Sequence, residues 1–164
     1  MYHTIINFFN MFSQMFSPTF EPMMQEALGL ARKAHANNEV PVGAIVWLND
    51  EIIGRGYNCP ISTSDPTAHA EIIALRAAAQ KINNYRILDA TLVVTLEPCV
   101  MCFNAMIHAR IKRLVFGAFD PKAGADSVFK LFNNRCFNHS IECIGGVLQK
   151  ECGQVLVDFF QSRR

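Results

Sequence analysis

Apolar residues recur along this chain first at helical spacing and then in short continuous runs. Between residues 21 and 37 they return every three or four positions, which predicts an amphipathic helix that stops at Asn37-Asn38. The apolar positions of this helix are Met24, Ala27, Leu28, Ala31 and Ala34. The run Gly43–Leu48, the polar pair Asn49-Asp50 and the run Glu51–Arg55 then predict a β-hairpin.

Helical and strand patterns alternate through the rest of the chain. Asp65-Pro66 is a typical helix start, since Asp caps the first turn and Pro at the first helical position loses no hydrogen bond. The elements expected after the hairpin are a helix over 65–81, a strand over 90–96, a helix over 98–109, strands over 113–117 and 141–144, and a helix over 147–160. This alternation predicts an α/β sandwich with helices on both faces of one sheet.

Composition narrows the class without naming a function. A chain of 164 residues, 51% hydrophobic and 18% charged, predicts one globular domain with a sizeable core. The net charge of +1 means that any phosphate binding must come from a local patch. The chain has 6 cysteines, which in a short secreted protein would indicate a disulfide framework. With a core of this size, we expect reduced thiols in a cytoplasmic protein instead.

Residues 1–20 form an apolar extension of unknown role ahead of the domain expected over 21–164. The stretch has no Lys or Arg before its apolar run and no small-residue cleavage site, so we expect no signal peptide, and it is too short and polar to span a membrane. Two interpretations stay open. Its phenylalanines recur at helical spacing, as in a helix that binds a membrane surface or a partner, or it is upstream sequence translated from an early start.

The candidate chemistry lies in His69-Ala-Glu71 and Pro98-Cys99-Val-Met-Cys102. Zinc binds Cys sulfur and His nitrogen readily, and three protein ligands leave a fourth position for water, as in catalytic sites. The combination H-x-E with P-C-x-x-C is the signature of zinc-dependent nucleobase deaminases. We therefore predict one zinc ion held by His69, Cys99 and Cys102.

Glu71 is the carboxylate that zinc does not need as a ligand. We predict that it accepts the proton of the attacking water, passes it to a ring nitrogen and then protonates the departing ammonia. Residues i and i+2 do not share a helix face, so His69 and Glu71 must diverge, one toward the metal and one beside it. A structural zinc site and a redox Cys-x-x-Cys pair remain as alternatives.

The sequence around these residues resembles bacterial tRNA-specific adenosine deaminases, members of the cytidine and deoxycytidylate deaminase superfamily. The similar segments run in order from about Met23 to Arg164, so only the N-terminal extension lies outside the resemblance. They include Glu39–Ala44, Asp65–Ile72, Thr95–Cys102, Ala105–His108 and Asp120–Ala125. The resemblance implies a cytidine-deaminase-like αβα sandwich with a central mixed sheet, a homodimer, and conversion of the wobble adenosine of a tRNA anticodon, chiefly of an arginine tRNA, to inosine.

The resemblance also implies contacts to the anticodon stem–loop, whose target base would be splayed into a pocket. Asn58 matches the position that hydrogen-bonds the substrate nucleoside. Asp120, Lys122 and Asn138 match contacts to the anticodon loop, and Phe160 lies on the C-terminal helix that faces RNA. At each of these positions the alternative is an ordinary structural role: a turn for Asn58, a solvated polar group, or a core phenylalanine.

Two positions depart from the family pattern. Phe119 and Ser140 stand where related sequences often carry Arg, and two fewer basic groups weaken phosphate contact and its salt dependence. Two other functions remain open on the sequence alone. One is deamination of a free base or nucleoside such as guanine or cytosine, and the other is a non-enzymatic zinc or RNA-binding module.

Overall fold

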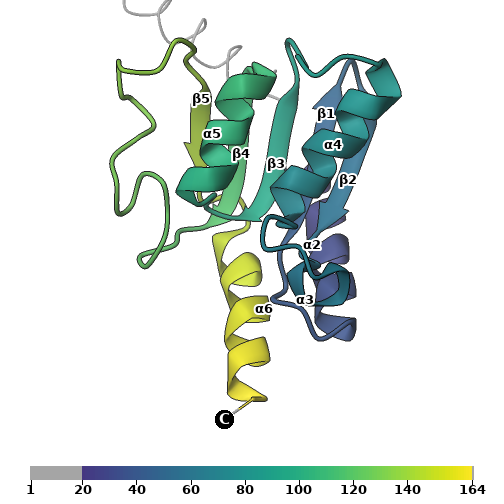
Figure 1. Ribbon diagram of the computed structural model, residues 1–164. Coiled ribbons are helices and arrows are strands. Elements are labelled where there is room, and N and C mark those ends of the chain that lie inside the picture. The colour runs from purple at the N-terminus through teal and green to yellow at the C-terminus, as the bar shows by residue number, and fades with distance from the viewer. Residues whose placement is uncertain (1–19, 164) are drawn as a thin grey trace, which may run out of the picture.

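The computed structural model describes residues 20–163, which form a five-stranded sheet between two layers of helices (Figure 1). In chain order the elements are α2 (Glu21–Ala36), β1 (Gly43–Leu48), β2 (Glu51–Tyr57), α3 (Pro60–Thr63), α4 (Ala70–Ile82), β3 (Thr91–Leu96), α5 (Val100–Ala109), β4 (Arg113–Ala118), β5 (Glu142–Gly145) and α6 (Gln149–Gln161). The predicted N-terminal extension lies outside the described residues, apart from Phe20.

The sheet has the order β2-β1-β3-β4-β5 and is mixed. β1 runs antiparallel to both β2 and β3, whereas β3, β4 and β5 run parallel to one another. Helices α4 and α5 cover one face, toward the viewer in Figure 1, and α2 and α6 pack on the other. This is the αβα sandwich that the sequence predicts.

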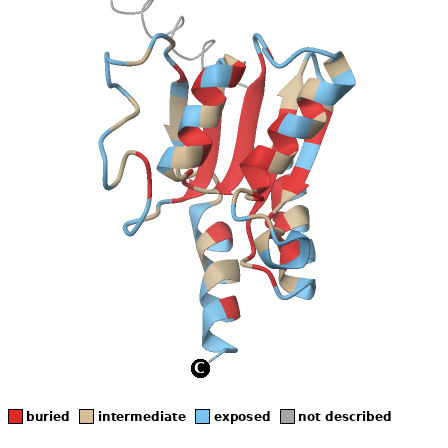
Figure 2. Cartoon of the chain, in the orientation of Figure 1, coloured by how far each residue is buried: buried red, intermediate tan, exposed pale blue. Residues whose placement is uncertain are grey.

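The core lies on both sides of the central strands. β3 is apolar and β-branched, and its residues Thr91–Thr95 are all buried, because helices cover both of its faces (Figure 2). One cluster of buried side chains joins the sheet to α4 and α5, and a second joins it to α2 and α6. The two helices that carry the candidate chemistry therefore rest on a packed sheet.

The structure corrects the start of one predicted helix. Asp65 and Pro66 belong to a turn, in which the Asp65 carboxylate accepts hydrogen bonds from the backbone N–H and the hydroxyl of Thr67 at 2.8 and 2.7 Å. The helix begins at Ala70 instead. An Asp side chain that bonds two residues ahead stabilises such a turn as well as it caps a helix, so the pattern alone does not separate the two.

A close approach of strand and helix places the first turn of α4 on the sheet. A Cβ atom on Gly56 of β2 would lie 2.2 Å from the carbonyl oxygen of Ala70, so only glycine allows this contact. The first turn of α4 therefore lies directly on the sheet. Among residues 20–163, no helix is long and apolar enough to span a membrane.

Candidate active site

Two helix starts meet at the carboxyl end of β3 and bring His69, Cys99 and Cys102 together. His69 and Cys99 occupy equivalent places, each an extended residue immediately before its helix, α4 and α5 respectively. Cys102 lies in the first turn of α5. The Nδ1 atom of His69 lies 3.7 Å from the Cys99 sulfur and 3.5 Å from the Cys102 sulfur.

These distances test whether zinc fits. Zinc bonds of about 2.0–2.1 Å to nitrogen and about 2.3 Å to sulfur give tetrahedral N-to-S edges of roughly 3.6 Å. The observed separations match that value, and all three ligand atoms lie within 4.8 Å of one another. His69, Cys99 and Cys102 are therefore placed to hold one zinc ion.

The environment acts in opposite directions on the two thiols of this group and favours the thiolate at Cys99. The contact with Cys102 lowers the pKa of Cys99 to about 4, with the His69 hydrogen bond acting in the same direction. The same contact and burial raise the pKa of Cys102. Both sulfurs lie at the start of α5, where the helix dipole stabilises negative charge. All 6 cysteines are free thiols, which agrees with the reduced state expected from the sequence.

Glu71 diverges from His69 because only one of them is helical. The backbone of His69 is extended, with φ −72° and ψ 154°, while Glu71 lies in the first turn of α4. Glu71 is buried, and burial raises its pKa to about 7. The structure thus provides, beside the ligand group, a carboxyl whose pKa suits proton transfer at neutral pH.

Asn58 is buried beside these residues and is oriented by α4. Its side-chain oxygen accepts a hydrogen bond from the Ala70 N–H at 2.8 Å, which satisfies the first donor of the helix. With the oxygen engaged in this way, the side-chain NH2 group has two N–H bonds to offer a ligand. Both the structural role and the predicted substrate contact are compatible with this geometry.

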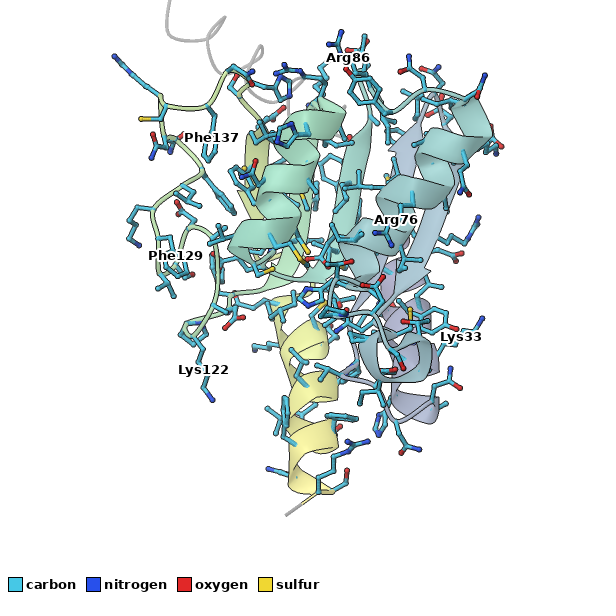
Figure 3. The ribbon with its side chains drawn as sticks, in the orientation of Figure 1. Lys33, Arg76, Arg86, Lys122, Phe129 and Phe137 are labelled. Carbon is cyan, nitrogen blue, oxygen red and sulfur yellow. The ribbon has the colours of Figure 1, made fainter. Side chains whose placement is uncertain are left out.

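Asp120, Lys122 and Phe160 line one cavity of about 860 Å³ between the segment after β4 and the outer face of α6. Lys122 is exposed and points away from the body of the molecule (Figure 3), and the Phe160 ring is 52% exposed. The Asp120 carboxylate accepts hydrogen bonds from the backbone N–H groups of Lys122 and Ala123 at 2.9 and 3.2 Å. Three of the five predicted substrate contacts thus share one surface.

Asn138 lies elsewhere. The Arg110 guanidinium, at the C-terminal end of α5, donates to the side-chain and backbone oxygens of Asn138 at 2.9 and 3.1 Å. Cys99 and Cys102 are at the opposite end of this helix of 10 residues, a distance of about 15 Å at 1.5 Å per residue. The structure does not bring Asn138 to the ligand group of its own chain.

Two buried carboxylates were not predicted to have a role. Glu97 follows β3, and the four donors that bind it lower its pKa despite its burial. Glu39 precedes β1 and accepts hydrogen bonds from the backbone N–H groups of Ile61 and Ser62 at 3.3 and 2.7 Å. A charged residue directly after an apolar strand is the sequence signal that could have identified Glu97, whereas Glu39 lies four residues before β1 and has no such signal.

Residues 18–118 match the family model of the cytidine and deoxycytidylate deaminase zinc-binding region. The chain is 57% identical over 147 residues to the tRNA-specific adenosine deaminase of Haemophilus influenzae, covering 88% of this chain and 84% of that protein. It is 42% identical over 145 residues to the corresponding protein of Bacillus subtilis, covering 88% and 90%. The chain belongs to the family of tRNA-specific adenosine deaminases.

Solved structures agree with this membership. A structure from a study of A-to-I editing by tRNA:A34 deaminases at the wobble position of transfer RNA matches this deaminase with a TM-score of 0.79 and 40% identity, over 81% of this chain and 97% of that chain. A guanine deaminase from Nitrosomonas europaea matches with a TM-score of 0.71 and 26% identity, over 87% and 84%. The fold is common to both, while the higher identity is to the tRNA deaminase.

Proposed function

We propose that this enzyme converts the wobble adenosine of a tRNA anticodon, chiefly that of an arginine tRNA, to inosine by hydrolytic deamination. The observation that carries the proposal is the ligand group His69, Cys99 and Cys102 with buried Glu71 beside it, in a chain 57% identical to a tRNA-specific adenosine deaminase. This group supports a hydrolytic reaction, and the similarity of sequence supports the substrate.

Glu71 moves the protons of the reaction. His69, Cys99 and Cys102 would hold a zinc ion, which would supply Lewis acidity to the water molecule that attacks the amine-bearing ring carbon. Glu71 takes a proton from that water and gives it to a ring nitrogen; it then takes the remaining proton of the added hydroxyl group and gives it to the amine, which departs as ammonia. Its raised pKa suits this work, because the carboxyl must be deprotonated at one stage and protonated at the next.

The cavity between residues 118–122 and α6 is proposed to receive the anticodon loop. Lys122 offers a positive charge to a phosphate, and the exposed ring of Phe160 offers a face for base stacking. Asn58, deeper and next to α4, is proposed to donate from its NH2 group to the inserted nucleoside. Inosine formation on tRNA also supports the cytoplasmic location expected from the sequence, because bacterial tRNA is cytoplasmic.

A panel of substrates tests the proposal. The enzyme is incubated with an arginine tRNA anticodon stem–loop bearing a wobble adenosine, and in parallel with free adenosine, guanine and cytosine. We expect inosine in the stem–loop and little or no product from the free compounds. Rapid deamination of guanine or cytosine with an unchanged stem–loop would favour the alternative, a free-base deaminase.

We also propose that the enzyme works as a homodimer. An apolar cavity of about 470 Å³ lies between α4 and α5, on the face turned away from the sheet, with Leu75, Tyr85 and Ala105 among its lining residues. Tyr85, one of these lining residues, is 64% exposed in the single chain. A second copy of the chain would cover this cavity. In such a dimer, Asn138 would contact RNA although it lies far from the ligand group of its own chain.

A charge introduced into this cavity, or groove, between α4 and α5 tests whether the chain forms a dimer through it. Ala105→Glu puts a carboxylate among apolar side chains, so we expect a shift from dimer to monomer in analytical ultracentrifugation. Asn104→Glu is the control, because Asn104 is exposed on the same helix and does not line the groove. A wild-type protein that sediments as a monomer would contradict this part of the proposal.

A further inference from the structure

Glu97 connects the metal-ligand segment to a loop that carries two predicted RNA contacts. It is 2% exposed and lies two residues before Cys99. Its Oε2 atom accepts hydrogen bonds from the Asp120 N–H at 3.0 Å and the Ser127 hydroxyl at 2.5 Å. Its Oε1 atom accepts from the N–H groups of Asp126 and Ser127 at 2.9 and 2.7 Å.

Backbone contacts also join the metal-ligand segment to this loop. The Ala125 N–H donates to the Pro98 carbonyl oxygen at 2.9 Å, and Gly124 forms an isolated bridge with Cys99. A Cβ atom on Gly124 would lie 2.5 Å from the carboxyl carbon of Glu97, so the loop reaches the carboxylate only because this residue is glycine. The loop of residues 119–127 is thus held at both of its ends by one buried side chain.

Only a carboxylate can accept all of these hydrogen bonds. A glutamine keeps one oxygen and presents an NH2 group on the other side, where the Asp120 N–H also donates. In Glu97→Gln the N–H groups of Asp126 and Ser127 can keep their acceptor, while the Asp120 N–H loses its acceptor in a buried place. Loss of a hydrogen bond to a charged group typically changes an equilibrium about tenfold or more.

We propose that Glu97 is a positioning residue, which fixes the loop of residues 119–127 against the turn that carries Cys99 and so determines how Asp120 and Lys122 meet the RNA. This inference rests on the proposed function, because the loop is given an RNA substrate there. It predicts that a change at Glu97 acts mainly on substrate binding and less on chemistry, although Glu97 is closer in sequence to a metal ligand than to Lys122.

Three variants and three readouts test the inference: Glu97→Gln removes one acceptor, Gly124→Ala displaces the loop while keeping the carboxylate, and Glu39→Gln is the matched control. Glu39 is an equally buried carboxylate that binds the N–H groups of Ile61 and Ser62 instead. The readouts are zinc content, residue-level amide hydrogen exchange, and KM and kcat for the anticodon stem–loop.

For Glu97→Gln we expect one zinc per chain, exchange at Asp120 about tenfold faster, KM about tenfold higher and kcat changed by less than about threefold. Gly124→Ala is expected to raise KM in the same way. Glu39→Gln is expected to speed exchange at Ile61 and Ser62 and leave Asp120 unchanged.

Three results would overturn the inference. Loss of zinc together with a large fall in kcat would mean that Glu97 supports the metal segment. Faster exchange at Asp120 with an unchanged KM would mean that the loop does not position RNA. Unchanged hydrogen exchange at Asp120 would mean that Glu97 does not hold the loop of residues 119–127. This readout does not depend on activity. A wild-type enzyme inactive on the stem–loop, by contrast, would overturn the proposed function itself.

Discussion

The ligand group and the cavity proposed to bind RNA are built in different ways, although both are near the same edge of the sheet. The ligand group lies at two helix starts that rest on the sheet. The Nδ1 atom of His69 is 3.5 Å from the Cys102 sulfur and 3.7 Å from the Cys99 sulfur. The cavity is formed by a loop and the outer face of α6, with exposed side chains such as Lys122 and Phe160. The proposed chemistry thus lies at helices packed on the sheet, and the proposed recognition depends on exposed side chains.

This contrast predicts that variants of the ligand group abolish activity, whereas variants of the cavity alter it by degrees. The largest effect is expected for Cys102→Ala, which removes a ligand from the first turn of α5. We expect the zinc content of the purified protein to fall far below one per chain and deamination to be lost. Cys152→Ala is the control, because Cys152 is also a buried free thiol but belongs to α6 and packs in the core between that helix and the sheet. Full zinc occupancy in Cys102→Ala would contradict the ligand assignment.

Glu71→Gln separates chemistry from metal binding within the ligand group. Gln cannot take the proton of the attacking water, so kcat is expected to fall by about 10² to 10⁴ while zinc stays at one per chain. Zinc is measured in the same sample as activity, with Glu51→Gln as a surface control. Normal turnover with zinc present would rule out Glu71 as the general base.

Lys122→Ala addresses the cavity. The predicted loss is one phosphate contact, so KM should rise several-fold, kcat should stay near the wild-type value, and the slope of log affinity against log salt should fall by about one. Lys81→Ala is the matched control, since Lys81 is an exposed lysine at the far end of α4. An equal effect of both variants would show that Lys122 acts only through net charge.

Glu39→Gln is expected to have the smallest effect, on stability as a function of pH. Burial raises the pKa of Glu39, but hydrogen bonds from Ser62 and Ile61 outweigh it and hold the pKa below its ordinary value of 4.5. A carboxyl with a lowered folded-state pKa contributes stability above its unfolded-state pKa and loses that contribution as the pH falls through the folded-state value. The Tm of the wild type should therefore fall more steeply below about pH 4.5 than that of Glu39→Gln. Parallel curves of Tm against pH for the wild type and Glu39→Gln would contradict this role of Glu39.

The sequence predicts the sandwich because its signals are local and agree with one another. The apolar run over β3, the Asn49-Asp50 turn and the helical spacing in α2 each match the element found. The predicted start of α4 is wrong because Asp65-Pro66 fits a turn as well as a helix start. The contacts that Gly56 and Asn58 make with Ala70, at the observed start, are tertiary and cannot be read from the local pattern.

The candidate site shows the same difference between local sequence signals and tertiary contacts. The metal ligands and Glu71 follow from a motif of fixed spacing, and the structure brings them together. The role of Glu97 depends on donors 23 to 30 residues away in sequence, so no local pattern could show them. The position of Asn138 similarly depends on Arg110, at the C-terminal end of the helix whose start carries Cys99 and Cys102.

The central claim is that the ligand group and Glu71 add water to the wobble adenosine of tRNA. The most direct measurement is deamination of an arginine tRNA anticodon stem–loop in water enriched in oxygen-18, followed by mass spectrometry of the released nucleosides. We predict inosine that carries the heavy oxygen, formed by the wild type and nearly absent with zinc-loaded Glu71→Gln. Unlabelled inosine, or a stem–loop that keeps its adenosine while a free base is deaminated, would contradict the claim.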